Sequence, residues 1–182
     1  MAIEPREILH YWFTEPVSRH WFSATPELDR EISERFQPLW ALAAEGQLDH
    51  WMTSAEGCLA LVILLDQFPL NMFRDQPESF RTVRQAREIA WFAIKRGFDQ
   101  ELTDARRAFL YMPYMHSESL QDQERSVELY EQAGLVDNLP FARGHREIVR
   151  RFGRFPHRNA ILGRPSRPEE LEYLASEGAF TG

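Results

Sequence analysis

The chain has 182 residues, a formal net charge of −7 and 43% hydrophobic residues, among them 13 Phe, 5 Trp and 5 Tyr. This composition excludes an intrinsically disordered chain, and a domain of this length can bury about 70% of the surface that its unfolded form exposes. Glycine is sparse, at 9 residues, which disfavours a turn-rich β architecture. We therefore expect one folded domain over residues 1–182.

The single cysteine, Cys58, lies in the apolar run "CLALVILL", where a thiol behaves as a buried small hydrophobe and not as a nucleophile. The absence of a disulfide framework suits a reducing compartment, and the start "MAIEPREILHYWF" has no apolar signal-peptide core. The longest apolar run has eight residues, far fewer than the roughly 20 of a membrane helix. We expect a cytoplasmic protein with no membrane partner.

The first strong helical pattern covers residues 25–46. It opens with Thr25 and Pro26 in cap and first-turn positions, carries apolar residues at three-to-four spacing and ends at a glycine. Pro38 lies inside the pattern and predicts a kink or a break into two helices, because proline removes a backbone donor.

The most apolar segment, residues 53–68, also reads as a helix. It begins with a capping box from Thr53 to Glu56 and is apolar on every face, which predicts a fully buried central helix. Pro69 follows directly and is expected to stop it.

Further helical patterns follow, and none of the intervening segments has the alternation of a β-strand. They cover residues 78–97, 101–112 (expected to stop at Pro113), 117–134, 138–153 and 167–176. The sequence predicts an all-α fold of stacked antiparallel helical hairpins.

Arginine is concentrated near the end of the chain, in and around "RFGRFPHRNAILGR" (151–164). From Leu139 to Arg167 there are eight Arg and one Glu, a local charge of +7. Guanidinium groups hold carboxylates or phosphates in a planar fork and stack on aromatic rings. Three interpretations stay open at this point: ion pairs with the chain's own carboxylates, a small-anion site, and a nucleic-acid surface.

The helix of residues 138–153 directs His145 toward its apolar side, with most of its arginines on the other faces. A glycine and a proline then end this helix, and the next polar residues leave on a connecting segment, where binding groups are often placed. The candidate ligand-binding residues of this region are Arg154, His157, Arg158 and Asn159.

A second polar stretch is "YMPYMHSES", in which His116 and Glu118 flank Ser117. Ser117 or Glu118 could cap the following helix, a structural role. His116 and Glu118 could instead act as a catalytic acid/base pair. Zinc would need further ligands from His145 or His157. Because the sequence has no glycine-rich phosphate loop, C-x-x-C pair or G-x-S-x-G elbow, we expect neither a metal nor a cofactor.

A third polar stretch, "LLDQFPLNMFRD", places Asp66 and Gln67 directly after the buried run. The negative end of a helix is unfavourable for an unpaired carboxylate, so Asp66 needs an arginine. Arg74, or an arginine of the C-terminal cluster, is the expected partner. This favours a structural role, although all three residues are kept as candidate ligand contacts.

The stretches "LVILLDQFPLNMFR", "FLYMPYMHSESLQDQ" and "RFGRFPHRNAILGR", with the early "YWF" and "HWF", resemble the bacterial family called domain of unknown function 924. The resemblance covers nearly the whole chain. It implies an all-α fold similar to tetratricopeptide superhelices, and it implies no activity. It gives family-typical positions without roles: Asp66, Gln67, Arg74, His116, Ser117, Glu118, Arg154, His157, Arg158 and Asn159.

These observations lead to a main hypothesis and two alternatives. The main one is a binding module whose concave side gathers the histidines and arginines around an anionic small molecule or an acidic peptide end. The first alternative is an enzyme, such as a hydrolase, in which His116 and Glu118 move protons. Nucleic-acid binding is disfavoured by the overall acidity.

Overall fold

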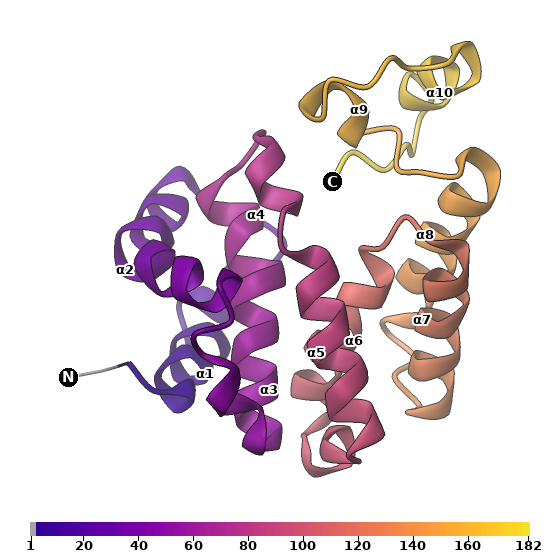
Figure 1. The fold of residues 1–182 in the computed structure, drawn as a ribbon. Helices are drawn as coiled ribbons and strands as arrows, with labels where there is room; N and C mark the ends of the chain where they lie inside the picture. The colour runs from indigo at the N-terminus through magenta and orange to yellow at the C-terminus, as the bar shows by residue number, and fades with distance from the viewer. Residues whose placement is uncertain (1–2) are drawn as a thin grey trace. The chain divides into compact units, whose positions relative to one another are not determined.

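The computed structural model describes residues 3–182, and the regular secondary structure of this part of the chain is entirely helical, with no β-strand (Figure 1). The predicted all-α fold is confirmed. The chain divides into two compact units: unit 1 ends at Arg74 and resumes over Glu78–Pro113, and unit 2 comprises Asp75–Pro77 and Tyr114–Gly182. We describe each unit by itself. The expectation of one domain over 1–182, and of a tetratricopeptide-like superhelix, stays a prediction.

Unit 1 is built from α-helices joined by short 3-10 turns. In it α3 packs against α1 and α5, and α2 packs against α4. The helices are α1 (Pro5–Phe13), α2 (Pro26–Ala44), α3 (Ala55–Val62), α4 (Phe68–Met72), α5 (Val83–Lys95) and α6 (Asp104–Met115), of which the last two residues belong to unit 2. The 3-10 turns are η1 (Val17–His20), η2 (Asp49–Thr53), η4 (Pro77–Phe80) and η5 (Phe98–Glu101).

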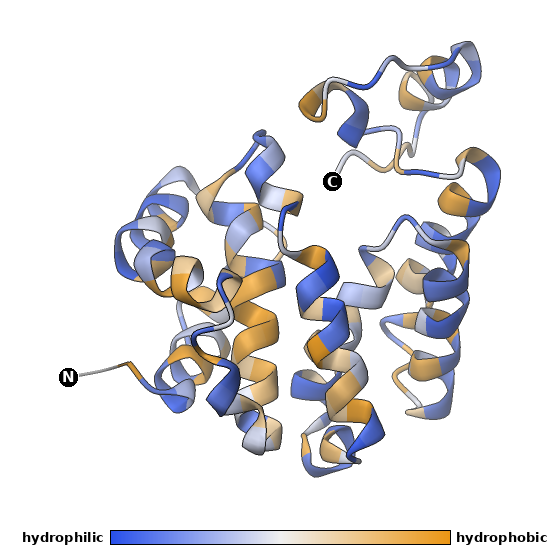
Figure 2. Ribbon diagram, in the orientation of Figure 1, coloured by the Kyte–Doolittle hydropathy of each residue, from blue (hydrophilic) through white to orange (hydrophobic). Residues whose placement is uncertain are grey.

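Helix α3 is the core of unit 1, and Figure 2 shows it as the most continuous hydrophobic segment. Every residue from Cys58 to Leu65 is at most 1% exposed. Burial raises the pKa of the Cys58 thiol to about 11, which confirms the interpretation of this residue as a hydrophobe. The capping box predicted at Thr53 is wrong by one position, because the hydroxyl of Ser54 accepts the Gly57 N–H at 3.1 Å.

Pro69 does not stop the central helix, contrary to the prediction. The chain passes from α3 through one π-helical turn, η3 (Ile63–Gln67), into α4, with the Phe68 N–H bonded to the Ile63 carbonyl. Proline cannot donate to the carbonyl four residues earlier, here that of Leu65. The hydroxyl of Thr82 donates to this carbonyl at 2.6 Å, so a residue of the neighbouring chain segment supplies the missing donor.

Two other prolines were also expected to interrupt helices and do not. Pro38 lies within the unbroken helix α2 on its exposed side, where water can reach the carbonyl that it leaves without an N–H. Pro113 lies within α6, which continues to Met115.

The stretch Ala55–Met72 is long and apolar enough to cross a membrane, but 83% of it is buried inside the fold. Burial of this extent is what the core helix of a globular domain shows. In the described part of the chain no second helix passes the same length and composition test.

Unit 2 is based on a hairpin of α7 (Leu120–Gln132) and α8 (Leu139–Phe152), which run side by side (Figure 1). The N-cap of α7 is Ser119, whose hydroxyl accepts the Asp122 N–H, so the predicted caps Ser117 and Glu118 are wrong. Gly153, with φ of 73°, ends α8 in the left-handed conformation that glycine adopts without strain.

The segment after α8 is more regular than predicted. His157–Asn159 were expected on a connecting segment, but a short helix, α9 (Arg158–Ile161), forms here. It is followed by α10 (Pro168–Leu174), close to the predicted last helix.

The Thr82 contact gives a test of how the proline is accommodated. Thr82→Val should lower the free energy of unfolding by about 1–3 kcal/mol, because it leaves the Leu65 carbonyl and the Trp40 indole N–H, 3.2 Å from the Thr82 hydroxyl, without their partner. In a Pro69→Ala background the loss should be smaller, since alanine restores a backbone donor.

Denaturant unfolding of the unmodified chain, of Thr82→Val, of Pro69→Ala and of the double variant measures this coupling. Thr53→Val, at an exposed hydroxyl, is the matched control and should cost little. Equal losses in both backgrounds would contradict the assignment of Thr82 as the replacement donor.

Candidate functional site

Most of the C-terminal arginine cluster is neutralised by the chain itself. Six of its eight arginines form ion pairs, mostly with carboxylates just outside the cluster. The pairs are Arg143–Glu131, Arg146–Glu147, Arg150–Glu124, Arg154–Glu170, Arg164–Glu118 and Arg167–Glu169. Two arginines of the cluster, Arg151 and Arg158, lie on the ring faces of Phe152 and Phe155, each at 4.6 Å from the centroid.

Glu118 is one of two carboxylates that organise unit 2. Arg164 holds it in a fork, with N···O distances of 2.7 and 2.9 Å, and the Phe155 N–H donates to it at 2.8 Å. Burial alone would raise the pKa of Glu118, but these hydrogen bonds outweigh burial and the pKa is lowered. Glu118 is therefore an ionised anchor with satisfied oxygens, a poor arrangement for a group that must exchange protons.

Glu170 is the second organising carboxylate, and its side chain is fully buried. Arg154 holds both of its oxygens at 2.7 Å, and the Arg167 N–H and the Asn159 amide donate to it as well. The hydrogen bonds from Arg154 hold the pKa of Glu170 far below its usual range. Arg154, predicted as a ligand contact, is thus committed to an internal pair.

Asn159 joins the two carboxylates into one network. Its side-chain oxygen accepts from Arg164 Nε at 3.0 Å, and its side-chain nitrogen donates to Glu170 at 3.2 Å. The network therefore runs from Glu118 through Arg164 and Asn159 to Glu170. It fixes the turn after α8 to α10 and to the segment that precedes α7.

The predicted His116 region is brought together with the α8–α9 turn, as the sequence suggested. Arg158 donates to the His116 carbonyl at 2.9 Å, across 42 residues of sequence. Gln123, fully buried on α7, donates to the carbonyls of Met115 and Ser117 at 2.7 Å each. The polypeptide at 115–117 is thus held by side chains from two other segments.

Three rings and one guanidinium group surround the ring of Phe155, which is fully buried. The rings of His145 and His157 lie at centroid distances of 5.5 and 5.6 Å from it, and that of Phe180 at 6.3 Å. Arg158, 8% exposed, lies over the Phe155 ring. We call His145, His157, Phe155 and Arg158 the ring cluster.

The two histidines of the ring cluster are held neutral. Burial lowers the pKa of His145 to about 4, against its hydrogen bond to the Phe141 carbonyl, and the charge of Arg158 lowers it further. Burial lowers the pKa of His157 to about 3, and the Arg158 charge is the next cause. At neutral pH the cluster therefore combines the charge of Arg158, which interacts with the ionised Glu118, with two uncharged imidazoles.

The remaining predicted residues belong to unit 1. Asp66 is fully buried in the π-helical turn and accepts a hydrogen bond from the neighbouring Gln67 amide. Arg74 forms a fork with Asp29, at 2.7 and 2.9 Å, a pair that sequence reasoning did not foresee.

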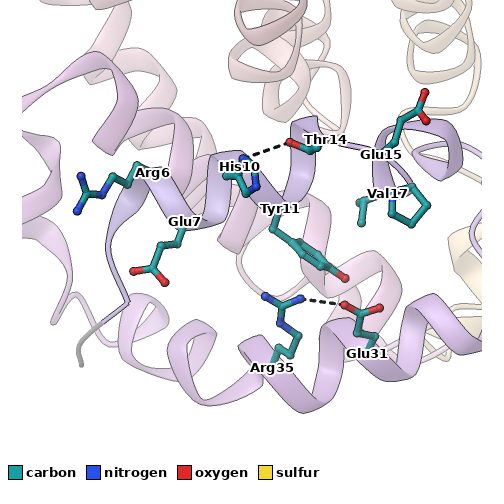
Figure 3. Close-up of a pocket in the computed structure, with 10 residues that line it drawn as sticks. Arg6, Glu7, His10, Tyr11, Thr14, Glu15, Val17, Glu31 and Arg35 are labelled. Atoms are coloured by element: carbon teal, nitrogen blue, oxygen red, sulfur yellow. Dashed lines mark hydrogen bonds and ion pairs between the residues drawn. The ribbon is translucent and has the colours of Figure 1, made fainter.

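Unit 1 also has an open depression of about 790 Å³ near α1 and α2 (Figure 3). Its charged groups are largely paired: Arg35 donates to Glu31 at 2.9 Å and stacks on the Tyr11 ring at 4.4 Å. Burial and the neighbouring Glu31 raise the pKa of Tyr11. Charges of both signs give this surface no clear preference for a ligand.

Sequence reasoning missed three residues of the site. Arg164 and Glu170 were not among the candidates, although the excess of arginine required nearby carboxylates and "RPEE" supplies them. Phe180 lies in the segment after α10 and belongs to no sequence motif that would have made it a candidate. Among residues 3–182 no group of three or more His, Cys, Asp or Glu side chains is placed to hold a metal ion.

The fold and this network define an all-helical protein with a charge-paired C-terminal unit and a cationic ring cluster. The model of the family described as bacterial protein of unknown function, DUF924, matches residues 8–178, and the chain belongs to this family. The structure of this chain is similar to that of the protein of unknown function ATU0120 from Agrobacterium tumefaciens, with 40% sequence identity and a TM-score of 0.88. The match covers 94% of this chain and 96% of that chain. Among curated proteins none matches significantly.

The buried network predicts a large difference between two adjacent glutamates. Glu170→Gln should lower the free energy of unfolding by about 3 kcal/mol, because it leaves the Arg154 guanidinium beside a neutral partner in a largely buried pair. Glu169→Gln, which removes an exposed pair with Arg167, should change it by less than about 1 kcal/mol. Denaturant unfolding compares them, and equal effects would contradict the assigned role of Glu170.

The neutral histidines predict a stability that falls with acidity. Since the folded pKa values of His145 and His157, about 4 and about 3, lie below the unfolded value near 6.5, the unfolded chain binds more protons below pH 6.5. The free energy of unfolding should therefore decrease from pH 6.5 to pH 5. NMR titration of the ring protons should show both imidazoles neutral at pH 5. Ordinary midpoints near 6.5 would contradict this.

Proposed function

We propose that unit 2 is a binding module for an anionic small molecule or an acidic peptide end, in which Arg158 and His157 receive the anionic group. One observation carries the proposal. Arg158, only 8% exposed, lies on the face of the Phe155 ring at 4.6 Å from its centroid, and the ring of His157 lies 5.6 Å from the same ring. A positive charge brought into such a site is a favourable partner for a carboxylate or a phosphate.

The internal pairs divide the predicted contact residues into two groups. Arg154 and Asn159 both donate hydrogen bonds to Glu170, and Glu118 accepts one from the Phe155 N–H. We therefore assign Arg154, Asn159 and Glu118 to the scaffold. Arg158 and His157 both lie against the Phe155 ring, so they are the groups that we assign to the ligand.

Binding of an anion here would be linked to protonation. A negative charge beside the imidazoles opposes the effect of Arg158 and raises the pKa of His157. The Nδ1 atom of His157 is buried with no hydrogen-bond partner among the described residues, so it offers a second polar contact for the bound group. The affinity for anions should accordingly increase as the pH falls through the raised pKa that His157 has in the complex.

The other hypotheses are less well supported. Glu118 has both oxygens occupied and a lowered pKa, which does not suit acid/base catalysis with His116. The pairing of six cluster arginines with carboxylates removes much of the basic surface that a nucleic acid would need. A cytoplasmic location fits the buried thiol of Cys58, and the α7–α8 hairpin fits a tetratricopeptide-like arrangement.

Thermal denaturation with inorganic phosphate, acetate, succinate and a peptide with an acidic C-terminus tests the proposal. A ligand at ten times its Kd should add about 1.4 kcal/mol of stability, a shift of a few degrees in Tm. Arg158→Ala should abolish the shift. Arg151→Ala is the matched control, because Arg151 lies on Phe152 at the same 4.6 Å but is exposed.

Two results would overturn the proposal. One is the absence of any shift across the whole panel. The other is an equal shift in Arg158→Ala and Arg151→Ala, which would place binding elsewhere.

A further inference from the structure

The segment after α10, residues 175–182, which we call the tail, lies against the ring cluster and places Phe180 there. The ring of Phe180 lies 4.4 Å from that of His145, tilted by 59°, and 4.9 Å from that of His157, edge to face at 88°. With the Phe155 ring at 6.3 Å, Phe180 has aromatic neighbours from α8 and from the turn that leads to α9. The rings of His145, Phe155 and His157 form a cage around the phenyl group of Phe180.

The cage is aromatic because its histidines are uncharged. His145 donates Nδ1–H to the Phe141 carbonyl at 2.8 Å, which orients its ring, and burial keeps both imidazoles neutral. Edge-to-face and tilted contacts at these distances are favourable between aromatic rings. A protonated, hydrated imidazole would be a worse wall for a phenyl group.

The tail is held over the cage at few points. The Phe180 N–H donates to the Tyr173 hydroxyl at 2.9 Å, and a Cβ placed on Gly182 would lie 3.3 Å from the His157 ring. Phe180 itself stays partly exposed, and Thr181 and Gly182 are exposed. The segment covers His157 without being buried in turn, so it can leave without opening the carboxylate network.

We propose that the cage of His145, Phe155 and His157 is the aromatic subsite of the anion site, and that Phe180 fills it while the chain is unliganded. The inference rests on the proposed function and narrows its ligand to a molecule that joins an aromatic ring to a carboxylate or phosphate. The ring of such a ligand replaces Phe180, and its anionic group reaches Arg158, which stacks on the same Phe155 ring. The tail therefore competes with the ligand.

Three probes separate the parts of this site: phenyl phosphate, inorganic phosphate and phenol. Calorimetry and thermal denaturation are carried out with the full chain, with Phe180→Ala and with Phe141→Ala. Phe141 is the matched control, because it is a phenylalanine of the same unit that is 64% exposed. Phe180→Ala should bind phenyl phosphate at least tenfold more tightly than the full chain or Phe141→Ala, while its affinity for inorganic phosphate changes by less than threefold.

The outcomes distinguish the inference from the proposed function. If inorganic phosphate binds but Phe180→Ala gains nothing for phenyl phosphate, the aromatic subsite is overturned and the anion site stands. If Phe180→Ala binds phenol and no anion binds any form, the proposed function fails and with it the aromatic anion as ligand. Tighter phenyl phosphate binding in Phe141→Ala as well would also overturn the subsite.

A second variant protects the test against misfolding of Phe180→Ala. Tyr173→Phe removes the hydroxyl that holds the Phe180 N–H but keeps the ring that packs on Phe152 at 5.1 Å. It should show a smaller gain for phenyl phosphate, about two- to fivefold. It should also make His157 react faster with diethyl pyrocarbonate, as measured by mass spectrometry. An unchanged reaction rate and an unchanged affinity would contradict the competition by the tail.

Discussion

The fully buried carboxylate of Glu170 is the constraint on which the end of the chain depends. A carboxylate without exposure is strongly unfavourable unless cations and hydrogen-bond donors surround it, and here Arg154, Arg167 and Asn159 do so. Glu170 is the buried residue of helix α10, and the Tyr173 ring packs on Phe152 beside it, so an ion pair together with one aromatic contact attaches this helix. Removal of the charge would take away the buried part of this attachment, which is why the arginines around it are part of the fold.

The same network determines what the rest of unit 2 can do. Phe155 belongs to both parts: its N–H donates to Glu118, whereas its ring carries Arg158 and contacts His145 and His157. The position of the ring cluster is therefore set by the scaffold carboxylates. The forks of Arg154 and Arg164 are closed by Glu170 and Glu118, so under the proposed function the anion is assigned to Arg158 on a pre-organised aromatic platform. Which arginines belong to the scaffold is not visible from the residue types.

The sequence was informative wherever a local pattern decides the structure, and misleading where distant groups decide it. Helix periodicity and the glycine at the end of α8 gave the all-α fold and most of the helices. Pro69 was expected to end a helix because its missing donor is a local effect, but Thr82 replaces that donor from 17 residues away. The charge imbalance of the arginine cluster pointed to unit 2, yet the partners of Arg154 and Arg164 lie 16 and 46 residues away, beyond any spacing rule. Phe180 had no polar pattern, and only packing shows its position.

The charge of the ring cluster depends on the burial of its two histidines. Protonated imidazoles at His145 and His157 would add two positive charges beside Arg158, and burial prevents this at neutral pH. The walls of the cage therefore stay apolar enough to hold a phenyl ring, as the contacts of Phe180 with His145 and His157 show. Under the proposed function, an anion bound beside His157 would raise the pKa of this histidine, and the second negative charge of a phosphate would raise it more than a carboxylate does. The proposed site would therefore link the charge of its ligand to the protonation of one histidine, through the same burial that keeps the cage aromatic.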